Sequence, residues 1–145
     1  MKVERSIEIA APPADVYEVV MDPHRLGDWV TVHAGLDDGA PERLRKGSKL
    51  GQSLKVAGQK FHVKWVVVTA EAPTAVEWEG RGPLGTKARV AYRLDDRDGS
   101  TCFDYMNEYE LPGGPLGKLG ARAFARTAGK EADRTLERLK GLLER

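Results

Sequence analysis

Hydrophobic and polar residues alternate along much of the chain before residue 111, which is the pattern of β-strands with one buried face. The first such stretch is residues 2–10, where Val3, Ile7 and Ile9 stand between polar neighbours. Pro12 follows and cannot donate the backbone hydrogen bond that a strand needs. The pattern therefore predicts a half-buried strand that stops before Pro12.

Two short helices are expected next. Residues 13–22 carry valines at helical spacing after a proline that suits the first helical turn. Residues 23–29 form a second short segment that ends near Trp29. A strand is then predicted over residues 30–36. It is followed by a loop over residues 37–47, which are rich in glycine, proline and charged residues.

Five more alternating stretches follow, separated by turns at 58–59, 72–74, 80–85 and 95–99. Consecutive strands joined by short turns predict an antiparallel sheet with one wet face. On that face, basic residues of one strand should oppose acidic residues of the next, which favours cross-strand ion pairs. The residues concerned are Lys87, Arg89 and Arg93 against Asp104, Glu108 and Glu110.

The last segment, residues 115–144, is predicted to be one long amphipathic helix. Its apolar face is uneven, because small residues occupy the first half and leucines the second. The members of this face are Ala121, Phe124, Ala125, Ala128, Ala132, Leu136, Leu139, Leu142 and Leu143. A sheet covered by one long helix, with two short helices near the N-terminus, is an α+β architecture.

Composition limits the classes of function. The chain has 145 residues, typical of one domain, so we expect a single domain over residues 1–145. Its 23 basic and 22 acidic residues give a net charge of +1, which argues against a nucleic-acid partner. Cys102 is the only cysteine, which excludes an internal disulfide. With no apolar run long enough for a signal peptide or membrane span, we predict a cytoplasmic protein without stable membrane insertion.

The order of elements resembles the helix-grip fold of the START-like, or Bet v 1-like, superfamily. Within it, the chain is most similar to the bacterial polyketide cyclase/dehydrase-like (SRPBCC) family. The resemblance is carried by SIEIAAPPADVYEVVMDPHRLGDW (6–29) and EYELPGGPLGKL (108–119). It implies a curved antiparallel sheet of about seven strands wrapped around the C-terminal helix, with a cavity for hydrophobic ligands. Family roles include lipid and sterol carriage, hormone sensing, and cyclisation or dehydration of polyketides.

The alanine-rich half of the last helix indicates whether space for such a cavity exists between helix and sheet. Alanines there either leave volume open or let helix and sheet approach closely, and the resemblance favours open volume. Mostly apolar walls with a few polar groups suit a small-molecule pocket. The predicted lining is Gln52, Leu54, Phe61, Val63, Trp65, Trp78, Val90, Tyr92, Phe103, Tyr105, Asn107, Tyr109, Phe124, Ala125, Ala128 and Ala132, with Thr69 as a further inward polar residue. For any single tyrosine an ordinary core role is favoured, whereas the grouping of tyrosines around Asn107 on one face favours a pocket.

Catalytic patterns are scarce in the sequence. His24, His33 and His62 lack the spacing of metal ligands, so no metal or other cofactor is expected and the catalytic residues stay unknown. Family cyclases place an inward arginine among aromatic residues, whereas here only Arg5 falls on an inward strand face and Arg81 in a loop. We therefore rank a binder of a hydrophobic small molecule above a polyketide cyclase/dehydrase, and expect a monomer or weak homodimer. An interaction partner without a ligand is the third alternative.

Overall fold

Seven strands form one antiparallel sheet in the computed structural model, which describes residues 1–110 and 117–145, with side chains of the last helix from residue 122 onward. The strands are β1 (Lys2–Ile9), β2 (His33–Leu36), β3 (Lys49–Val56), β4 (Gln59–Glu71), β5 (Ala75–Arg81), β6 (Lys87–Arg97) and β7 (Ser100–Glu110). Their spatial order is β1-β7-β6-β5-β4-β3-β2. The first strand thus closes one edge of the sheet beside the last.

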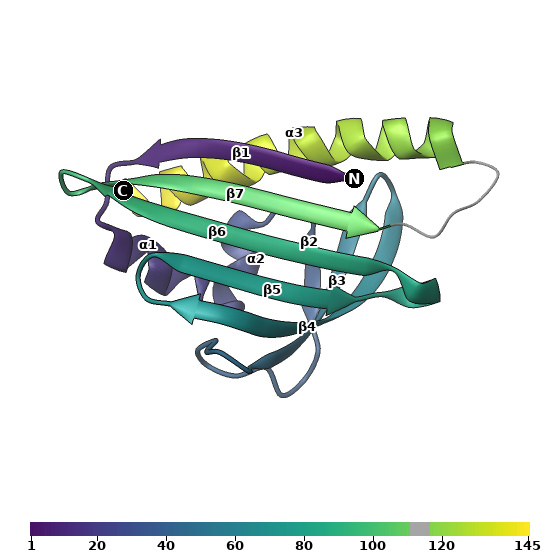
Figure 1. Ribbon diagram of the computed structural model, residues 1–145, viewed down its shortest axis with the longest axis horizontal. Helices are drawn as coiled ribbons and strands as arrows, with labels where there is room; N and C mark the ends of the chain where they lie inside the picture. The colour runs from purple at the N-terminus through teal and green to yellow at the C-terminus, as the bar shows by residue number, and fades with distance from the viewer. Residues whose placement is uncertain (111–116) are drawn as a thin grey trace.

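The helices lie on one side of this sheet. They are α1 (Pro13–Val20), α2 (Leu26–Trp29) and α3 (Gly117–Leu143), with single 3₁₀ turns η1 (Pro23–Arg25) and η2 (Pro83–Gly85). In Figure 1 the long α3 runs along the β1 edge of the sheet, its C-terminal half behind the strands, and α1 and α2 lie near its C-terminal end. This is the START-like helix-grip fold that the sequence predicted. The Pro-Gly-Gly-Pro segment (112–115), where the last helix was predicted to begin, and the side chain of Ala121 lie outside the described residues.

Short helices after β1 follow from local chemistry. Pro13 begins α1, where its missing N–H costs no hydrogen bond. The Asp22 carboxylate accepts a hydrogen bond from the His24 N–H, at 3.0 Å, and so caps η1. Trp29, at the end of α2, is fully buried. These elements close the end of the core where the leucines of α3 also pack.

The register of the sheet confirms that the predicted basic and acidic residues lie opposite each other. It also corrects the direction in which Thr69 was predicted to point. Lys87 lies opposite Glu110, and Arg93 opposite Asp104. In β4, however, a bulge at Val68 shifts the register, so that Thr69 lies opposite Glu77 on the outer face. The prediction that Thr69 points inward was wrong, because one extra residue reverses the alternation beyond it.

The turn between β6 and β7 is also tighter than expected. The ladder continues to Arg97, which pairs with Ser100, whereas the sequence had placed a turn over 95–99. Asp98 and Gly99 alone form the turn, with φ values of 55° and 90°. Two residues with positive φ match the twist of a two-residue hairpin.

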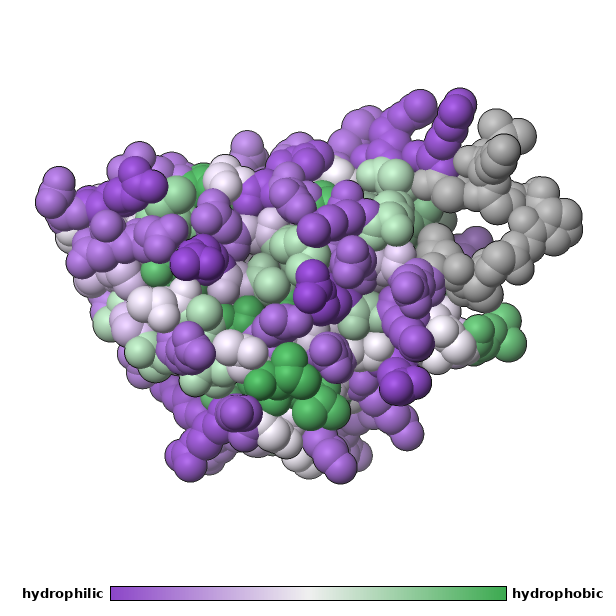
Figure 2. Space-filling view, viewed as in Figure 1, coloured by the Kyte–Doolittle hydropathy of each residue, from purple (hydrophilic) through white to green (hydrophobic). Residues whose placement is uncertain are grey.

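Charged residues dominate the outer surface. The face in Figure 2 is mainly hydrophilic, with small hydrophobic areas between charged side chains. Within the described residues, no helix is both long and apolar enough to cross a membrane.

Candidate functional site

Aromatic side chains fill the inner face of the sheet. Tyr92 and Tyr105 stack across β6 and β7, with ring centroids 5.8 Å apart and planes inclined by 16°. Trp78 meets Tyr92 edge-on at 6.1 Å, and Trp65 meets Trp78 edge-on at 5.9 Å. Trp29 reaches Tyr92 from α2, at 5.8 Å. The rings therefore form one continuous cluster between the sheet and the helices.

A small cavity lies beside this cluster, at the end of the sheet that carries the β3–β4 and β5–β6 hairpins. Its volume is about 20 Å³, enough for about one water molecule. The residues that line it are Leu54, Val56, Phe61, Val63, Gly82, Pro83, Thr86, Ala88, Tyr109 and Phe124. We refer to it as the inner cavity and to this end of the molecule as the hairpin end.

Phe124 is the contribution of α3 to the inner cavity. Its ring meets Phe61 edge-on at 6.1 Å and Tyr109 edge-on at 5.8 Å. Within the described residues, the backbone of α3 comes closest to β1, α2 and β3. Large side chains of the central strands consequently lie between α3 and the middle of the sheet.

The structure brings only part of the predicted lining to the inner cavity. Leu54, Phe61, Val63, Tyr109 and Phe124 border it. The other sheet residues are buried in the adjoining core: Gln52, Trp65, Trp78, Val90, Tyr92, Phe103, Tyr105 and Asn107. Of the helix alanines, Ala132 is buried, whereas Ala125 and Ala128 are half-buried.

Several lining residues escaped the sequence prediction. Gly82 and Pro83 belong to the turn predicted over residues 80–85, and both line the cavity. Ala88 alternates with the outward Lys87 and Arg89 and so faces inward, but alternation alone does not mark its small side chain as a source of space. Ala88 lies directly opposite Tyr109 in β7, and an alanine leaves the volume beside that ring unfilled.

Gly80 has a different role on the same face. A Cβ atom at this position would lie 2.6 Å from both Trp65 Cε3 and Val63 Cγ1. The missing side chain therefore makes room for the Trp65 ring rather than for a ligand.

Buried polar atoms that have no partner in the described part of the chain, among them Trp29 Nε1, stand among the aromatic residues, and two of them belong to side chains of the sheet. The Asn107 Nδ2 donates a hydrogen bond to the Tyr105 hydroxyl, but within the described residues Asn107 Oδ1 and Trp78 Nε1 have no partner. Both belong to side chains that are at least nine-tenths buried. An unpaired buried polar atom is costly, so a ligand that supplied a hydrogen-bonding partner would be favoured here.

The buried tyrosines are neutral phenols at physiological pH. Burial raises the pKa of Tyr109 to about 12. Burial raises the pKa of Tyr92, and that of Tyr105, further still, and the neighbouring tyrosines add to the effect. The cluster thus resists negative charge.

His33 ends a polar chain across three strands. The Trp65 indole N–H donates to Gln52 Oε1 at 2.9 Å, and Gln52 Nε2 lies 2.8 Å from His33 Nδ1. Because the indole can only donate, Gln52 must present its amide N–H to His33, whose Nδ1 therefore accepts. Burial lowers the pKa of His33. His33 is accordingly a neutral imidazole that carries its proton on Nε2.

Arg5 does not enter the interior, although it faces the inner side of β1. Its Nε lies 2.7 Å from Asp133 Oδ1 on α3, and its Nη1 donates to the Glu4 carbonyl. Gly129 lies beside the guanidinium, since a Cβ there would be 2.9 Å from Arg5 Nη2. Arg5 thus joins the sheet edge to α3. Arg81 is exposed.

Other reactive side chains are dispersed. Within the described residues, no group of three or more His, Cys, Asp or Glu side chains could hold a metal ion. His62 is exposed and lies 2.8 Å from Asp37 Oδ2. Cys102 is half-buried and lies opposite Glu8 and Asp95 in the sheet, on its outer face.

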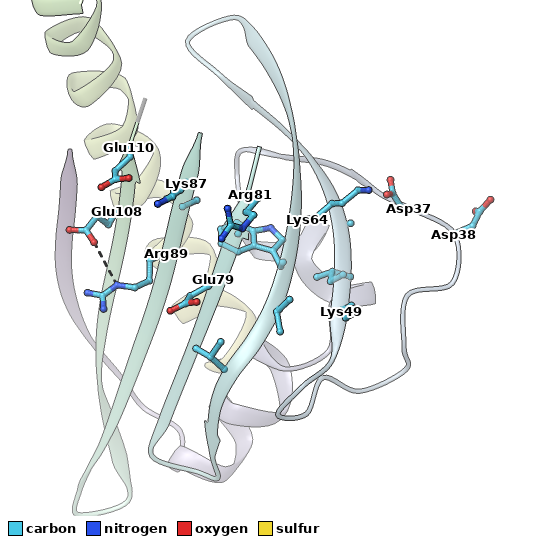
Figure 3. Close-up of a pocket in the computed structure, with 17 residues that line it drawn as sticks. Asp37, Asp38, Lys49, Lys64, Glu79, Arg81, Lys87, Arg89, Glu108 and Glu110 are labelled. Carbon is cyan, nitrogen blue, oxygen red and sulfur yellow. Dashed lines mark ion pairs between the residues drawn. The ribbon is translucent and has the colours of Figure 1, made fainter. Parts of the chain in front are cut away.

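The outer face carries a broad open trough of about 900 Å³. Figure 3 shows its charged side chains, which include Lys49, Lys64, Arg81, Lys87 and Arg89 together with Asp37, Asp38, Glu79, Glu108 and Glu110. Arg89 bridges Glu77 at 3.2 Å and Glu108 at 3.6 Å. The trough is separated from the inner cavity by the sheet itself.

Comparisons with known proteins agree with this architecture. The model of the family described as polyketide cyclase/dehydrase and lipid transport matches residues 1–144. An uncharacterized protein of Mycobacterium tuberculosis, Rv1546, is 30% identical over 125 residues, covering 83% of this chain and 86% of the relative.

Two solved structures show the same fold. One is the Zhui aromatase/cyclase of Streptomyces sp. R1128, with a TM-score of 0.82 at 16% identity, covering 100% of this chain and 94% of that one. The other is a START superfamily protein of Mycobacterium smegmatis, with a TM-score of 0.73 at 20% identity, covering 99% of this chain and 97% of that one.

Proposed function

This chain belongs to the polyketide cyclase/dehydrase and lipid transport family, and we propose that it binds a hydrophobic small molecule between the sheet and α3. The observation that carries the proposal is the inner cavity, with apolar walls from Leu54, Phe61 and Phe124 and the Tyr109 ring at its side. Apolar walls with a few polar groups are the usual composition of a ligand site.

Ligand binding requires the inner cavity to widen. Its volume of about 20 Å³ is far below the roughly 300–1,000 Å³ of a typical small-molecule site. Phe124 is the side chain that must move, because it contacts both Phe61 and Tyr109 across the cavity. Movement of its ring away from Phe61 and Tyr109 would enlarge the cavity beside the aromatic cluster.

The chemistry of the interior favours a neutral ligand with a polar tip. The raised pKa values of Tyr92, Tyr105 and Tyr109 show an environment that disfavours negative charge. A hydroxyl group suits Asn107, because it can donate to Oδ1 or accept from Nδ2. We therefore expect a largely apolar molecule with a hydroxyl at one end.

Native mass spectrometry tests this proposal directly. The protein would be purified from its native host and sprayed under non-denaturing conditions, and the retained mass identified after release. We expect one small apolar molecule per chain. A chain that carries no ligand from its host, and that takes up no member of an apolar hydroxylated compound panel, would contradict the proposal.

A second candidate function is cyclisation or dehydration of a poly-β-keto substrate. It is favoured by His33, a neutral imidazole on the inner side of β2 that lies opposite Leu54 of the cavity wall. Such a group can accept or donate a proton near physiological pH. Product profiling would compare the wild type with His33→Gln and Tyr105→Phe. If the wild type redirects cyclisation and His33→Gln abolishes this effect without weakening ligand binding, the cyclase function would be favoured over simple ligand binding.

A further inference from the structure

Leu84 stands exposed at the tip of the β5–β6 hairpin. Its exposed fraction is 88%, far above the 37% of Val66, the other large apolar side chain with a high exposure among the described residues. Its backbone is left-handed, with φ 56° and ψ 34°. That conformation favours glycine or asparagine, so the geometry of the turn does not call for a leucine.

The same end of the molecule is lined with cations. Arg81 and Lys87 lie opposite each other at the base of this hairpin, and Lys64 lies opposite Arg81 in β4. Lys55 and Lys60 form another like-charged pair at the base of the β3–β4 hairpin. All five are exposed, and none forms an ion pair within the described residues. Figure 1 shows both hairpins at the right-hand side of the molecule.

Like charges placed directly opposite in a sheet repel one another. Lys64 and Lys87 therefore each repel Arg81 between them, although Glu110 faces Lys87 from the other side, and an approaching anionic surface would relieve this repulsion. Figure 3 shows these three side chains on neighbouring strands.

Charge is distributed unequally between the two ends of the sheet. The β6–β7 hairpin, at the end opposite the hairpin end, carries Asp95, Asp96 and Asp98 around Arg97. The β6–β7 hairpin therefore has no counterpart of the cation row Lys64–Arg81–Lys87. An anionic surface would orient the molecule with the hairpin end toward it.

We propose that the hairpin end docks reversibly on an anionic lipid bilayer, with Leu84 inserted at the headgroup boundary and Lys64, Arg81 and Lys87 against the lipid charge. A bilayer offers apolar depth beside negative charge, which matches one apolar tip flanked by cations. A protein partner would need a broader apolar area, since stable interfaces bury roughly 800 Å² on each side.

The location links this docking surface to the inner cavity. Pro83, the neighbour of Leu84, lines the cavity, so a docked molecule would hold its inner cavity next to the bilayer. A hydrophobic ligand could then pass between bilayer and protein over a short path. The docking itself does not depend on the ligand.

Vesicle co-sedimentation provides the test, with phosphatidylcholine vesicles that contain or lack phosphatidylserine. We expect binding only to the anionic vesicles, and weaker binding at high salt. Leu84→Asn should weaken binding about tenfold, because it removes one buried apolar side chain. Asparagine tolerates the left-handed backbone, so this variant should fold normally. In Leu84→Trp, the indole emission should shift to the blue when vesicles are added.

Charge reversal supplies the matched control. Lys87→Glu should weaken vesicle binding at least about tenfold, whereas Arg93→Glu, the same change on the same strand away from the hairpin end, should leave it unchanged. Equal effects of the two variants, or full binding by Leu84→Asn, would overturn the proposal. So would a Leu84-dependent dimer that does not bind vesicles, since a second copy would then be the occupant.

Discussion

Tyr92 and Tyr105 lie directly opposite each other in β6 and β7 and stack with their ring centroids 5.8 Å apart. The pair stands at the centre of the aromatic cluster, below α3 and α2. Its hydroxyl groups are buried with it, and one of them accepts the hydrogen bond from Asn107. The stack therefore fixes both the packing and the polarity of the interior.

Alkaline pH should weaken the fold through these phenols. Burial raises the pKa of Tyr109 to about 12 and the pKa values of Tyr92 and Tyr105 further, while unfolded tyrosine titrates near 10. The stability that depends on the neutral phenols is fully present below about pH 10 and is lost as pH rises toward the folded pKa values.

Denaturant unfolding measured from pH 8 to pH 12 would check this expectation. Each buried phenol contributes a slope of up to about 1.4 kcal/mol per pH unit above pH 10. Tyr105→Phe should reduce that slope, whereas Tyr17→Phe, at a half-buried position, should reduce it less. An equal slope in the wild type and Tyr105→Phe would show that Tyr105 ionises freely in the fold.

His33 gives the opposite dependence, at acid pH. Burial lowers the pKa of His33. Protonation of His33 Nδ1 would bring its N–H group against the amide N–H group of Gln52, so that two donors would face each other without an acceptor. The stability that depends on neutral His33 is fully present above about pH 6.5 and is lost as pH falls toward the lowered pKa. We expect the free energy of unfolding to fall between pH 7.5 and 5.5, and His33→Gln to reduce that fall. His24→Gln, at an exposed histidine, should change nothing; a similar change in both variants would refute the role of His33.

Gly80 should tolerate no side chain. A Cβ atom there would lie 2.6 Å from Trp65 and Val63, so Gly80→Ala should cost about 1–3 kcal/mol of stability through overpacking. Gly35→Ala is the matched control in another strand, because no atom lies within 4 Å of its ideal Cβ. Thermal unfolding of both variants would measure the difference, and equal melting temperatures would contradict the packing described for Trp65.

The ion pairs on the outer face should matter little. Arg89 lies 3.6 Å from Glu108, with 41% of each side chain exposed. A double-mutant cycle with Arg89→Ala and Glu108→Ala should give a coupling free energy of about 0–1 kcal/mol, reduced by salt. A coupling well above that range at high salt would mean that the pair is shielded from solvent.

The fold could be predicted largely because alternation and turn residues agreed along the chain. The strand pattern placed Tyr92 and Tyr105 on the inner face, and their burial follows from it. Thr69 was misplaced because a bulge adds one residue to β4 without a glycine or proline to mark it. The short turn at Asp98 was hidden among neighbouring acidic residues.

The site was predicted less well, for physical reasons. Periodicity tells which residues face inward but not which inward volume stays unfilled. Ala88 opens space whereas Gly80 admits the Trp65 ring, although both are small inward residues on neighbouring strands. The contact of His33 with Gln52 depends on an irregular register between β2 and β3, and the exposure of Leu84 depends on how far its hairpin projects.

Binding of a neutral apolar fluorophore tests the central claim most directly. The wild type would be titrated beside Ala88→Leu, which fills the inner cavity, and Ala91→Leu, the same change on the outer face of the same strand. Circular dichroism would first establish the temperature range in which all three are folded. The account predicts about one fluorophore per chain, roughly tenfold weaker binding by Ala88→Leu, and no change in Ala91→Leu. Equal affinities in the three proteins, or no binding by the wild type, would contradict a ligand site between the sheet and α3.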